Sequence, residues 1–410
     1  MDRQLAKATR QHTREHNSSL VLRTIYDNNE ISRAELARLT KLTRTTVSDV
    51  VTSLIERGLV VEVGPGTSTG GRTPMLLSVL DDARHLIGVH LRSNDLCGAT
   101  INLRGGIRRR VQRTIPSGDS ERVLPLICDL IDELIASATS PLLGIGVSTP
   151  GLIDMTAGIV RRAVNFGWQD LPLREILRAR YQLPVYLGND AHMAALAEYT
   201  FGASQNRQNL VVIRAGQGIG AGIILNGRLY HGHDYGAGEI GHIVVAENGI
   251  RCKCGNFGCL ETVAGTGQIV RRAQQIAAEH PESALHRYAP DIARLDLDAV
   301  VRACADGDEA VRKLVAEVGR YLGAVLAGLV GILNVERIVI SGQVARFGEP
   351  LREAAVAEMA RRALPTLVQR TEVAVVEESP DAVLLGISAL LLNYELVLQR
   401  HLVGAPLREG

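Results

Sequence analysis

Apolar residues near the N-terminus recur at helical spacing and are interrupted by short polar turns. Leu20, Val21 and Ile25, with the neighbouring Leu22, form the apolar stripe of a predicted helix that ends near residues 28–29. Each later apolar stripe is again preceded by a residue that favours a helix N-terminus. We therefore expect the chain to open with a compact segment of several helices.

A second helix is predicted over residues 32–39. Ser32 and Glu35 have the spacing of a capping box, in which each side chain bonds the backbone N–H of the other residue. The helical period then predicts that Leu36 and Leu39 are buried.

A third helix is predicted to begin after Thr43, a good N-cap residue. Val47, Val50, Val51 and Leu54 form its apolar face, and Gly58 ends it. Two short apolar runs follow, LVVEV and MLLSV, and predict a β-hairpin around the tip GPGTSTGGRT. Three helices with a short turn before the last, followed by a hairpin, are the order of a winged helix-turn-helix, which we assign to residues 1–80.

The polar face of the third helix gives this segment its chemistry, because a recognition helix reads base edges from its N-terminal end. The glycine-rich tip of the hairpin adds an arginine suited to the DNA backbone or a narrow minor groove. A small domain that uses the same polar face to bind another protein is the alternative. The predicted DNA-binding residues are Thr43, Arg44, Thr45, Thr46, Ser48 and Arg72.

From about residue 84 the pattern changes to short strands interleaved with helices. HLIGVHL, LCGATINL, RRRVQRTI and LLGIGVS are strand-like, and ERVLPLICDLIDELIASA is a helix between them. A second set starts at NLVVIRAG and ends with a helix from about residue 382. Two similar halves predict an α/β architecture with two lobes around a cleft. The polar stretch 277–300 is expected to be a surface excursion.

Composition agrees with a large globular protein. The 410 residues exceed one small domain, and with 46% hydrophobic but only 3% aromatic residues the cores must be aliphatic. We find no apolar run near the roughly 18 residues of a membrane span and no apolar signal-peptide core, so we expect a cytoplasmic protein without membrane contact. The net charge of +1 divides into +3 before residue 81 and −2 after it. This small basic excess lies in the predicted DNA-binding segment.

Three of the six cysteines crowd into the sequence CKCGNFGC. In a cytosolic chain such crowding indicates a metal site rather than disulfides. With an upstream histidine as fourth ligand, the set is a closed tetrahedral zinc site without an open catalytic position. Three free thiols in a loop are the alternative, and His231 or His233 could replace the histidine. The predicted ligands are His242, Cys252, Cys254 and Cys259.

Asn189 and Asp190 lie where a predicted strand ends and a helix begins, in GNDAHMAALAEY. Ligands bind at strand ends in α/β folds, and an amide beside a carboxylate can hydrogen-bond vicinal hydroxyls. Asp190 could also act as a general base toward a sugar hydroxyl. Helix capping is an equally good interpretation of these two residues. The glycine-rich segment RAGQGIGAGI could likewise bind a phosphate or form a tight hairpin.

Taken together, these motifs resemble the ROK family of repressors, sugar kinases and uncharacterised reading frames. The resemblance covers about residues 84–395 and is carried by VSTPGLID, AVNFGW, GNDAHMAALAEY and, most specifically, AGEIGH with CKCGNFGCLE. It implies an actin-like ATPase fold of two lobes with a zinc loop, and leaves residues 396–410 as a C-terminal tail. The family's regulators carry a winged helix that its kinases lack.

The resemblance also implies a sugar site. The family contacts its sugar through an Asn-Asp pair, the Glu and His of an E-x-G-H element, the Glu after the third Cys and a glycine after the fourth strand. The family's zinc ligands coincide with the four metal ligands predicted from spacing. In this sequence the sugar-contacting positions fall on Asn189, Asp190, Glu239, His242, Glu261 and Gly151.

Three nucleotide-binding elements of the family's kinases are altered in this chain. Where the kinases have a D-x-G-G-T turn, His90 replaces the Asp and Arg-Ser-Asn at 92–94 replaces the Gly-Gly-Thr. The second turn has Gln217 between two glycines where the kinases usually have Gly-Thr-Gly, and the third reads Ser-Gly-Gln at 341–343. Bulky residues keep the backbone further from a phosphate. We therefore predict a sensor and not an enzyme.

These observations predict a sugar-responsive, DNA-binding regulator of carbohydrate metabolism genes, and more specifically a repressor. Its partners would be double-stranded operator DNA and a sugar effector, with a structural zinc ion. A homodimer or homotetramer would align winged helices with operator half-sites. An ATP-dependent sugar kinase with a DNA-binding arm is the first alternative, because Asp190 is present. A winged helix that binds a protein partner is the second.

Overall fold

The computed structural model describes residues 10–66, 73–115, 122–205 and 207–396. The chain forms two compact units. Unit 1 consists of residues up to 188 together with those from 387 onward, and unit 2 consists of residues 189–386. The second unit is therefore inserted into the first along the sequence.

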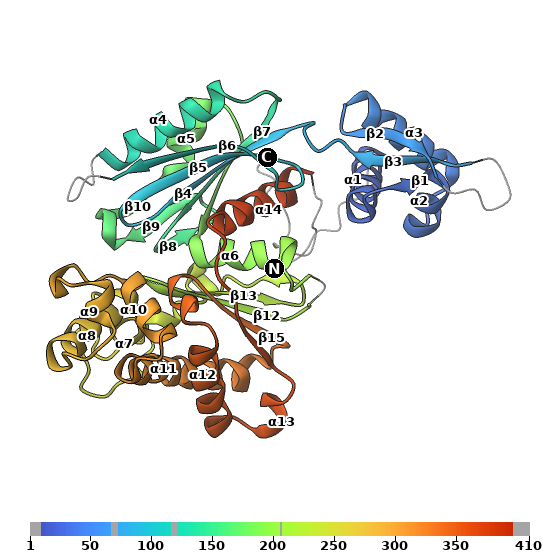
Figure 1. The fold of residues 1–410 in the computed structure, drawn as a ribbon. Coiled ribbons are helices and arrows are strands. Elements are labelled where there is room, and N and C mark those ends of the chain that lie inside the picture. Colours follow the sequence, from blue (N-terminus) through green and yellow to red (C-terminus); the bar gives the residue numbers. More distant parts are fainter. Residues whose placement is uncertain (1–9, 67–72, 116–121, 206, 397–410) are drawn as a thin grey trace. The chain divides into compact units, whose positions relative to one another are not determined.

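Unit 1 begins with the winged helix, drawn in blue in Figure 1. The order of its helices and strands confirms the predicted helix-turn-helix followed by a hairpin. The two hairpin strands pair antiparallel, and a short strand that precedes the second helix pairs with the outer edge of the second hairpin strand. The elements are α1 (Arg10–Asn28), β1 (Ile31–Ser32), α2 (Arg33–Thr40), α3 (Arg44–Glu56), β2 (Val60–Pro65) and β3 (Met75–Val79).

The three helices pack around side chains that have no exposed surface, including Ile25, Leu36 and Leu54. The predicted capping box is present, since the Glu35 N–H donates to Ser32 Oγ and the Ser32 N–H donates to the Glu35 carboxylate. Burial of the apolar stripes and capping of α2 thus fix the helix-turn-helix.

The prediction that Leu39 is buried is wrong, since its relative exposure is 50%. Helix α2 is only eight residues long, and α1 and α3 pack against its Leu36 side. Lys41 then takes a left-handed conformation, with φ 57°, and ends the helix. The chain turns into α3 at this point, and Leu39 remains on the outer side of α2.

Helix α1 is attached to the turn after strand β5 (Asp95–Asn102). The Tyr26 hydroxyl donates to the Leu103 carbonyl at 2.9 Å, and burial raises the pKa of Tyr26 to about 12. The Arg104 guanidinium lies 4.1 Å from the centre of the Tyr26 ring and donates to the Tyr26 carbonyl at 2.6 Å. A cation–π contact and two hydrogen bonds therefore hold the end of α1.

The main sheet of unit 1 has five strands in the order β11-β7-β4-β5-β6. Strand β4 pairs antiparallel with β5 and parallel with β7, and all seven of its residues are buried. Burial on both faces explains its continuous apolar run. Besides β5, the strands are β4 (His85–Leu91), β6 (Ile107–Thr114), β7 (Leu142–Thr149) and β11 (Val185–Asn189).

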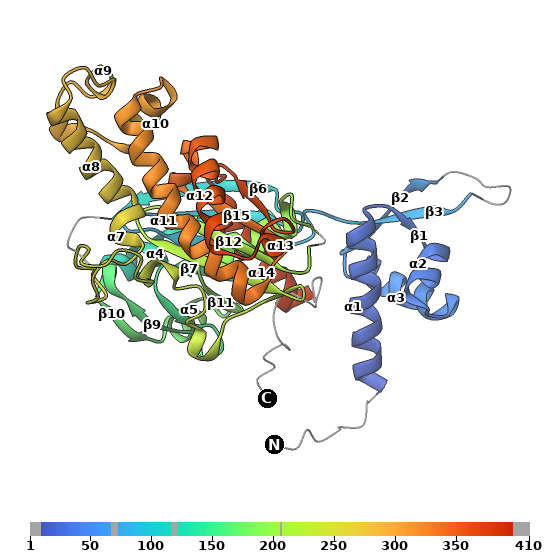
Figure 2. The same cartoon turned by 90° about the horizontal axis from the view of Figure 1, so that it is seen from below.

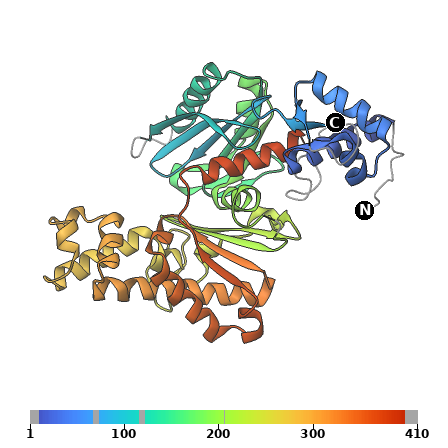
Figure 3. The ribbon, with the colours of Figure 1, turned by 45° about the vertical axis from the view of Figure 1, so that its right-hand side comes forward.

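Helices cover both faces of this sheet. A Cβ on Gly98 of β5 would lie 2.2 Å from Leu130 of α4 (Val123–Ala136). A Cβ on Gly146 of β7 would lie 2.2 Å from Ile387 of α14 (Ala382–Leu396). Gly98 lies opposite Val89 of β4, whereas Gly146 lies opposite the preceding residue, Gly88. Successive residues of a strand point to opposite faces, so α4 and α14 pack on opposite faces of the sheet, as Figures 1 and 3 show.

A small second sheet of unit 1 was not predicted from the sequence. Its strands are only three to five residues long and pair in the order β10-β9-β8. Such short strands give too few alternating positions to be recognised. The elements of this part are β8 (Leu152–Asp154), β9 (Ile159–Ala163), β10 (Trp168–Leu171) and α5 (Leu173–Tyr181).

Unit 2 is built on a second five-stranded sheet in the order β14-β13-β12-β15-β16. Strand β12 pairs antiparallel with β13 and parallel with β15, which also pairs parallel with β16. The glycine-rich segment between β12 and β13 is a tight hairpin, in which the Gly216 N–H donates to the Gly218 carbonyl. The strands are β12 (Leu210–Ala215), β13 (Ile219–Leu225), β14 (Arg228–Leu229), β15 (Arg337–Ser341) and β16 (Glu372–Val375).

Alternation along β13 assigns its two faces. Gly220 and Gly222 lie against α6 (Asp190–Phe201), whereas Ile219, Ala221 and Ile223 belong to the core formed with the other helices of the unit. That core includes α11 (Glu309–Leu333) and α12 (Glu349–Arg362). The shorter helices are α7 (Glu261–Ala264), α13 (Pro365–Val368), η2 (Val164–Phe166, in unit 1), η3 (His233–Tyr235), η4 (Ile240–His242), η5 (Ile292–Arg294) and η6 (Gln343–Phe347).

The stretch 277–300 is more than the predicted surface excursion. Leu285, Leu295 and Val300 are buried and belong to the core of unit 2. Leu285 begins α9 (Leu285–Tyr288), Leu295 precedes α10 and Val300 lies within it. Helices α9 and α10 pack with α8 side by side in Figure 2. The polar average of the stretch concealed these few apolar positions. The other two helices are α8 (Thr266–Glu279) and α10 (Leu297–Ala305).

Contrary to the sequence expectation, one described helix, α11, is long and apolar enough to cross a membrane by length and composition. Half of its apolar window is buried, and Val318, Leu322 and Leu326 have no exposed surface. Its apolar character is accounted for by the core that it forms with α12.

Candidate functional site

The N-terminal end of α3 presents the predicted DNA-binding face. Thr43 is the N-cap, accepting from the Thr46 N–H at 3.2 Å, and the two hydroxyls lie 2.8 Å apart. Arg44, Thr45 and Ser48 are exposed. Capping therefore orders the first turn of α3 and leaves three polar side chains on its surface. Arg72 lies outside the described residues.

Asn189 is the residue through which strand β11 passes into α6. It is the N-cap, and its Oδ1 accepts hydrogen bonds from the N–H groups of Ala191 at 2.9 Å and His192 at 3.4 Å. The capping interpretation is thus confirmed for Asn189. It does not exclude a ligand contact, because the amide also carries two donor hydrogens.

Asp190 opens the first turn of α6 and forms an ion pair. Its Oδ2 accepts from Arg214 Nη1 at 2.8 Å, and Arg214 Nε donates to Glu378 Oε1 at 2.7 Å. Burial alone would lower the pKa of Arg214, but the charges of Asp190 and Glu378 outweigh it and raise that pKa. Two carboxylates thus share one guanidinium.

Glu239 interacts electrostatically with three other predicted sugar-site residues, His242, Asp190 and Glu261. Desolvation raises the pKa of Glu239; His242 opposes this, while the negative charges of Asp190 and Glu261 add to it. His242 Nε2 lies 3.8 Å from Glu239 Oε2. Glu261 is held at the start of β13, where its Oε2 accepts from the Ile219 N–H at 3.3 Å. Several hydrogen-bond acceptors therefore gather within unit 2, as expected of a site that binds hydroxyls.

Gly151 belongs to unit 1 and has a positive φ of 100°. A Cβ at this position would lie 2.2 Å from the Arg162 carbonyl. The close approach of β9 therefore requires a glycine there, whatever else the residue does.

A compact group of four potential metal ligands lies next to Glu239. The ligand atoms of His242, Cys252, Cys254 and Cys259 all lie within 4.8 Å of one another. Cys252 Sγ is 3.6 Å from His242 Nδ1, and Cys254 Sγ is 3.7 Å from Cys259 Sγ. This group could hold a metal ion.

The backbone fixes the loop that carries the thiols. The Cys252 N–H donates to the Asn256 carbonyl at 2.7 Å. Gly255 and Gly258 have positive φ, and a Cβ on Gly258 would meet the Ala246 carbonyl at 1.8 Å. Burial raises the pKa of Cys259 to about 12, and the neighbouring thiols add to this. Three thiolates could therefore share this space only if a cation offset their charges.

The two alternative histidines are not members of this group. His231 is packed edge-on against His192, with ring centres 5.5 Å apart, and burial lowers its pKa to about 4. The side chain of His233 is 96% exposed and lies 3.4 Å from Asp234.

Side chains fill the turn between β4 and β5, the position of the first nucleotide element. Arg92 donates to Asp95, both through its backbone N–H and through its guanidinium. Ser93 Oγ accepts from Asn165 at 3.1 Å. His90, which occupies the position of the kinase Asp, is buried in β4.

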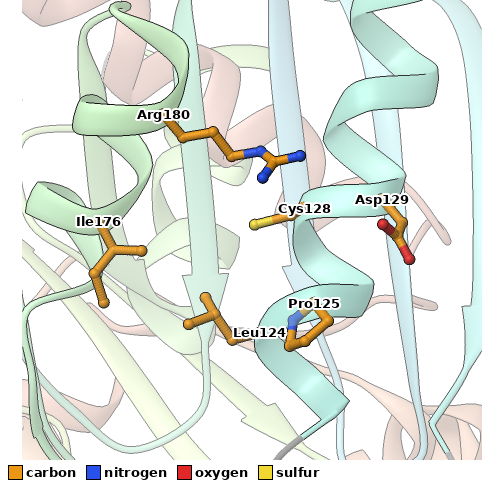
Figure 4. A pocket seen from close by; sticks show the side chains of 6 residues that line it. All are labelled: Leu124, Pro125, Cys128, Asp129, Ile176 and Arg180. Atoms are coloured by element: carbon orange, nitrogen blue, oxygen red, sulfur yellow. The ribbon is translucent and has the colours of Figure 1, made fainter.

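An open pocket on unit 1 lies apart from the predicted site residues, none of which lines it. It is formed by α4 and α5, and Figure 4 shows Cys128 and Arg180 pointing into the same space. Arg180 is already paired with Asp132 at 2.7 Å. Leu124, Pro125, Asp129 and Ile176 complete the lining.

Sequence reasoning overlooked Arg214. The signal was present, because an arginine inside the apolar strand NLVVIRAG must find a negative partner. What the sequence could not give was the identity of the partners, since Asp190 is 24 residues away and Glu378 is 164 residues away.

Comparison with known proteins extends the picture to the whole chain. The sequence model of the ROK family matches residues 86–393, and that of the MarR family matches residues 15–67. A xylose repressor from Caldicellulosiruptor bescii is 33% identical over 383 residues, which cover 92% of this chain and 95% of the repressor. The DNA-binding transcriptional dual regulator NagC from Escherichia coli is 32% identical over 375 residues, covering 89% of each chain.

Two solved structures are similar to this chain, one of a regulator and one of a kinase. A ROK family transcriptional regulator, described as a homologue of the E. coli MLC protein, aligns with a TM-score of 0.80 and 27% identity, covering 95% of this chain and 99% of its own. A ROK family glucokinase from Streptomyces griseus in complex with glucose and AMPPNP aligns with a TM-score of 0.67 and 27% identity, covering 75% and 98%. With one family model spanning most of its length, the chain belongs to the ROK family, joined to a MarR-type winged helix.

Proposed function

We propose that this protein is a sugar-responsive transcriptional repressor of carbohydrate metabolism genes. The observation that carries the proposal is the extent of the similarity. The repressors and the regulator structure align with the winged helix and the ROK domain together, whereas the glucokinase leaves a quarter of this chain unmatched. Acting on DNA, such a protein works in the cytoplasm, as a homodimer or homotetramer that presents paired winged helices.

The sugar site that we propose draws on the acceptors gathered in unit 2. Asp190, Glu239 and Glu261 offer carboxylate oxygens, and Asn189 offers an amide beside them. Such groups bind vicinal hydroxyls by charge-assisted hydrogen bonds. His242 completes the proposed set in unit 2. Gly151, which belongs to unit 1, stays a prediction from the resemblance.

We propose that the four-ligand group binds zinc. Tetrahedral Zn–S and Zn–N bonds place two sulfurs about 3.8 Å apart and a sulfur and a nitrogen about 3.6 Å apart. The separations of 3.7 Å between Cys254 and Cys259 and of 3.6 Å between Cys252 and His242 fit these values. Four protein ligands leave no open position, so the ion would stabilise the loop without taking part in catalysis.

His242 would connect the two parts of the site. Its Nδ1 faces the thiols, and its Nε2 lies near Glu239. When one ring nitrogen binds a metal, the other carries the proton and becomes a hydrogen-bond donor. The metal would thereby make His242 a fixed donor toward a sugar oxygen.

We propose further that the site binds its sugar without phosphorylating it. The Arg92 and Ser93 side chains are engaged in the turn where a kinase needs a glycine backbone against phosphates. Asp190, the position of the kinase base, already accepts from Arg214. A sugar kinase remains the second candidate, and the observation in its favour is the likeness to the glucokinase.

Substitutions on α3 should separate base reading from general affinity. Arg44→Ala or Thr45→Ala should each lower the preference for operator over random DNA by about 5- to 150-fold, the cost of a lost base contact of about 1–3 kcal/mol. Arg72→Ala should weaken both DNAs alike, as expected for a backbone contact. Gel-shift titrations measure both quantities. Arg294→Ala in unit 2 removes an exposed arginine outside the winged helix and should change neither.

The function itself is tested by the response of DNA binding to sugars. Fragments selected from random DNA by the protein supply the operator, and xylose, N-acetylglucosamine and glucose form the first panel. One sugar should lower operator affinity by roughly 5- to 150-fold, the range of allosteric coupling. The fluorescence of Trp168, the single tryptophan, reports sugar binding independently. Operator affinity that no sugar of a full monosaccharide panel alters would refute the proposal.

A further inference from the structure

Arg214 occupies an unusual place for a charged residue. It lies in β12, a strand whose other residues are buried and apolar. Its neighbours across the sheet are small, Gly220 on β13 and Ser341 on β15. Gly220 faces α6, so the space left by these neighbours lies on the α6 side of the sheet. The sheet thus makes room there for one guanidinium.

The two partners of Arg214 hold it from both sides. Nη1 is 2.8 Å from Asp190 and Nε is 2.7 Å from Glu378, and the three side chains are only 22%, 21% and 13% exposed. Partly buried charges of this kind interact more strongly than surface pairs. Removing one member leaves the others without compensation. The three residues therefore form one coupled network of ion pairs.

Asp190 and Glu378 both lie close to the points where the chain passes between unit 1 and unit 2. The chain passes between the two compact units at 188–189 and again at 386–387. Asp190 is the second residue after the first passage, and Glu378 precedes the second passage by eight residues. Arg214 therefore connects, through two hydrogen bonds, the chain segments that enter and leave unit 2.

The same two segments also touch directly. A Cβ on Gly386 would lie 1.8 Å from the Met193 carbonyl, so the first turns of α14 pack against the backbone of α6. Contact this close leaves little space for one segment to move without the other. A displacement at Asp190 thus has a short route to the start of α14.

We propose that Arg214 is a positioning residue that transmits effector binding at Asp190 to the segment 376–386. The inference rests on the proposed function, in which a sugar hydroxyl binds Asp190. A hydroxyl that donates to Asp190 competes with Arg214 for the same carboxylate and so alters the Arg214–Glu378 pair. Glu378 takes part in the response without touching the sugar.

Hydrogen exchange tests this connection without any ligand. Asp190→Asn should increase the exchange rate of the peptide 376–386 by about threefold or more, because Arg214 links Asp190 to Glu378 within that peptide. In an Arg214→Met background the same Asp190→Asn change should add nothing. Glu317→Gln removes another partly buried ion pair of unit 2, to Arg272, and serves as the control. Equal exchange of 376–386 in all these variants would overturn the inference.

Sugar titrations separate affinity from coupling. Glu378→Gln should reduce the sugar-induced fall in operator affinity about fivefold or more, while the sugar dissociation constant measured by Trp168 fluorescence stays within about threefold. Glu317→Gln should leave both unchanged. Glu378→Gln also covers the case in which Arg214→Met does not fold. The probe is whichever of xylose, N-acetylglucosamine or glucose changes the fluorescence.

Failure of the inference differs from failure of the proposed function. If the unmodified protein responds to sugar and Asp190→Asn binds it poorly, but Glu378→Gln responds fully, the proposed function stands and the role of Arg214 is refuted. If Asp190→Asn binds sugar normally, the proposed site is refuted, and the inference with it.

Discussion

Replacing Asp190 with asparagine should abolish the response to sugar, while the protein still binds sugar-free operator DNA specifically. The substitution keeps the shape of the side chain and removes the charge that strengthens a hydrogen bond from a sugar hydroxyl. A hydrogen bond to a charged group contributes about 1.5–3 kcal/mol, so sugar affinity should fall by roughly 10- to 150-fold. Operator titrations with and without the sugar measure the effect.

A control and an enzymatic assay complete this test. Asp298→Asn removes an exposed partner of Arg346 in the same unit and should leave the sugar response intact. Incubation with Mg-ATP and the responsive sugar should give no phosphorylated sugar, since side chains occupy the first phosphate turn. Turnover that disappears in Asp190→Asn would instead identify the protein as a kinase.

The second large effect is expected at the cysteine loop. The purified protein should carry about one zinc ion per chain, and Cys254→Ser should carry almost none, because a closed structural site needs all four ligands. Structural zinc binding contributes about 10–16 kcal/mol at neutral pH, so its loss should release the loop. Sugar affinity should then fall as well, through displacement of His242 and Glu261. Elemental analysis and Trp168 fluorescence measure the two effects.

The same chemical change elsewhere in the chain gives the control. Cys128 is partly exposed on α4 and does not belong to the four-ligand group. Cys128→Ser should therefore retain both zinc and sugar binding. A metal-free protein that binds sugar with undiminished affinity would contradict the role assigned to the loop.

Local signals predicted the winged helix well. The capping box of Ser32 and Glu35 and the N-cap Thr43 each depend on residues three positions apart, and the structure confirms both. The prediction that Leu39 is buried was wrong because helical periodicity identifies the apolar side of a helix, but not how far the neighbouring helices extend along that side. The same limit applies to the stretch 277–300, where tertiary partners decide which few residues are buried.

The site residues likewise divide into those that a short stretch of sequence could predict and those that only the fold brings together. The cysteines lie close in sequence, so spacing alone grouped them with His242, and their ligand atoms do come together. The pairing of Asp190 with Arg214 and Glu378 depends on the register of β12 and on the segment after β16. No pattern within a short window contains that information, because the partners are brought together only by the fold.

The insertion of unit 2 within unit 1 has a consequence for biosynthesis. A ribosome completes residues 189–386 before it has made residues 387–396, which pack against Gly146 in the first sheet. Unit 2 can therefore fold as soon as it emerges from the ribosome. The five-stranded sheet of unit 1 is still incomplete then, because the face that α14 covers is open to solvent. During that interval the nascent chain presents an apolar surface, and chaperones are the natural agents to shield it until synthesis of the last helix ends.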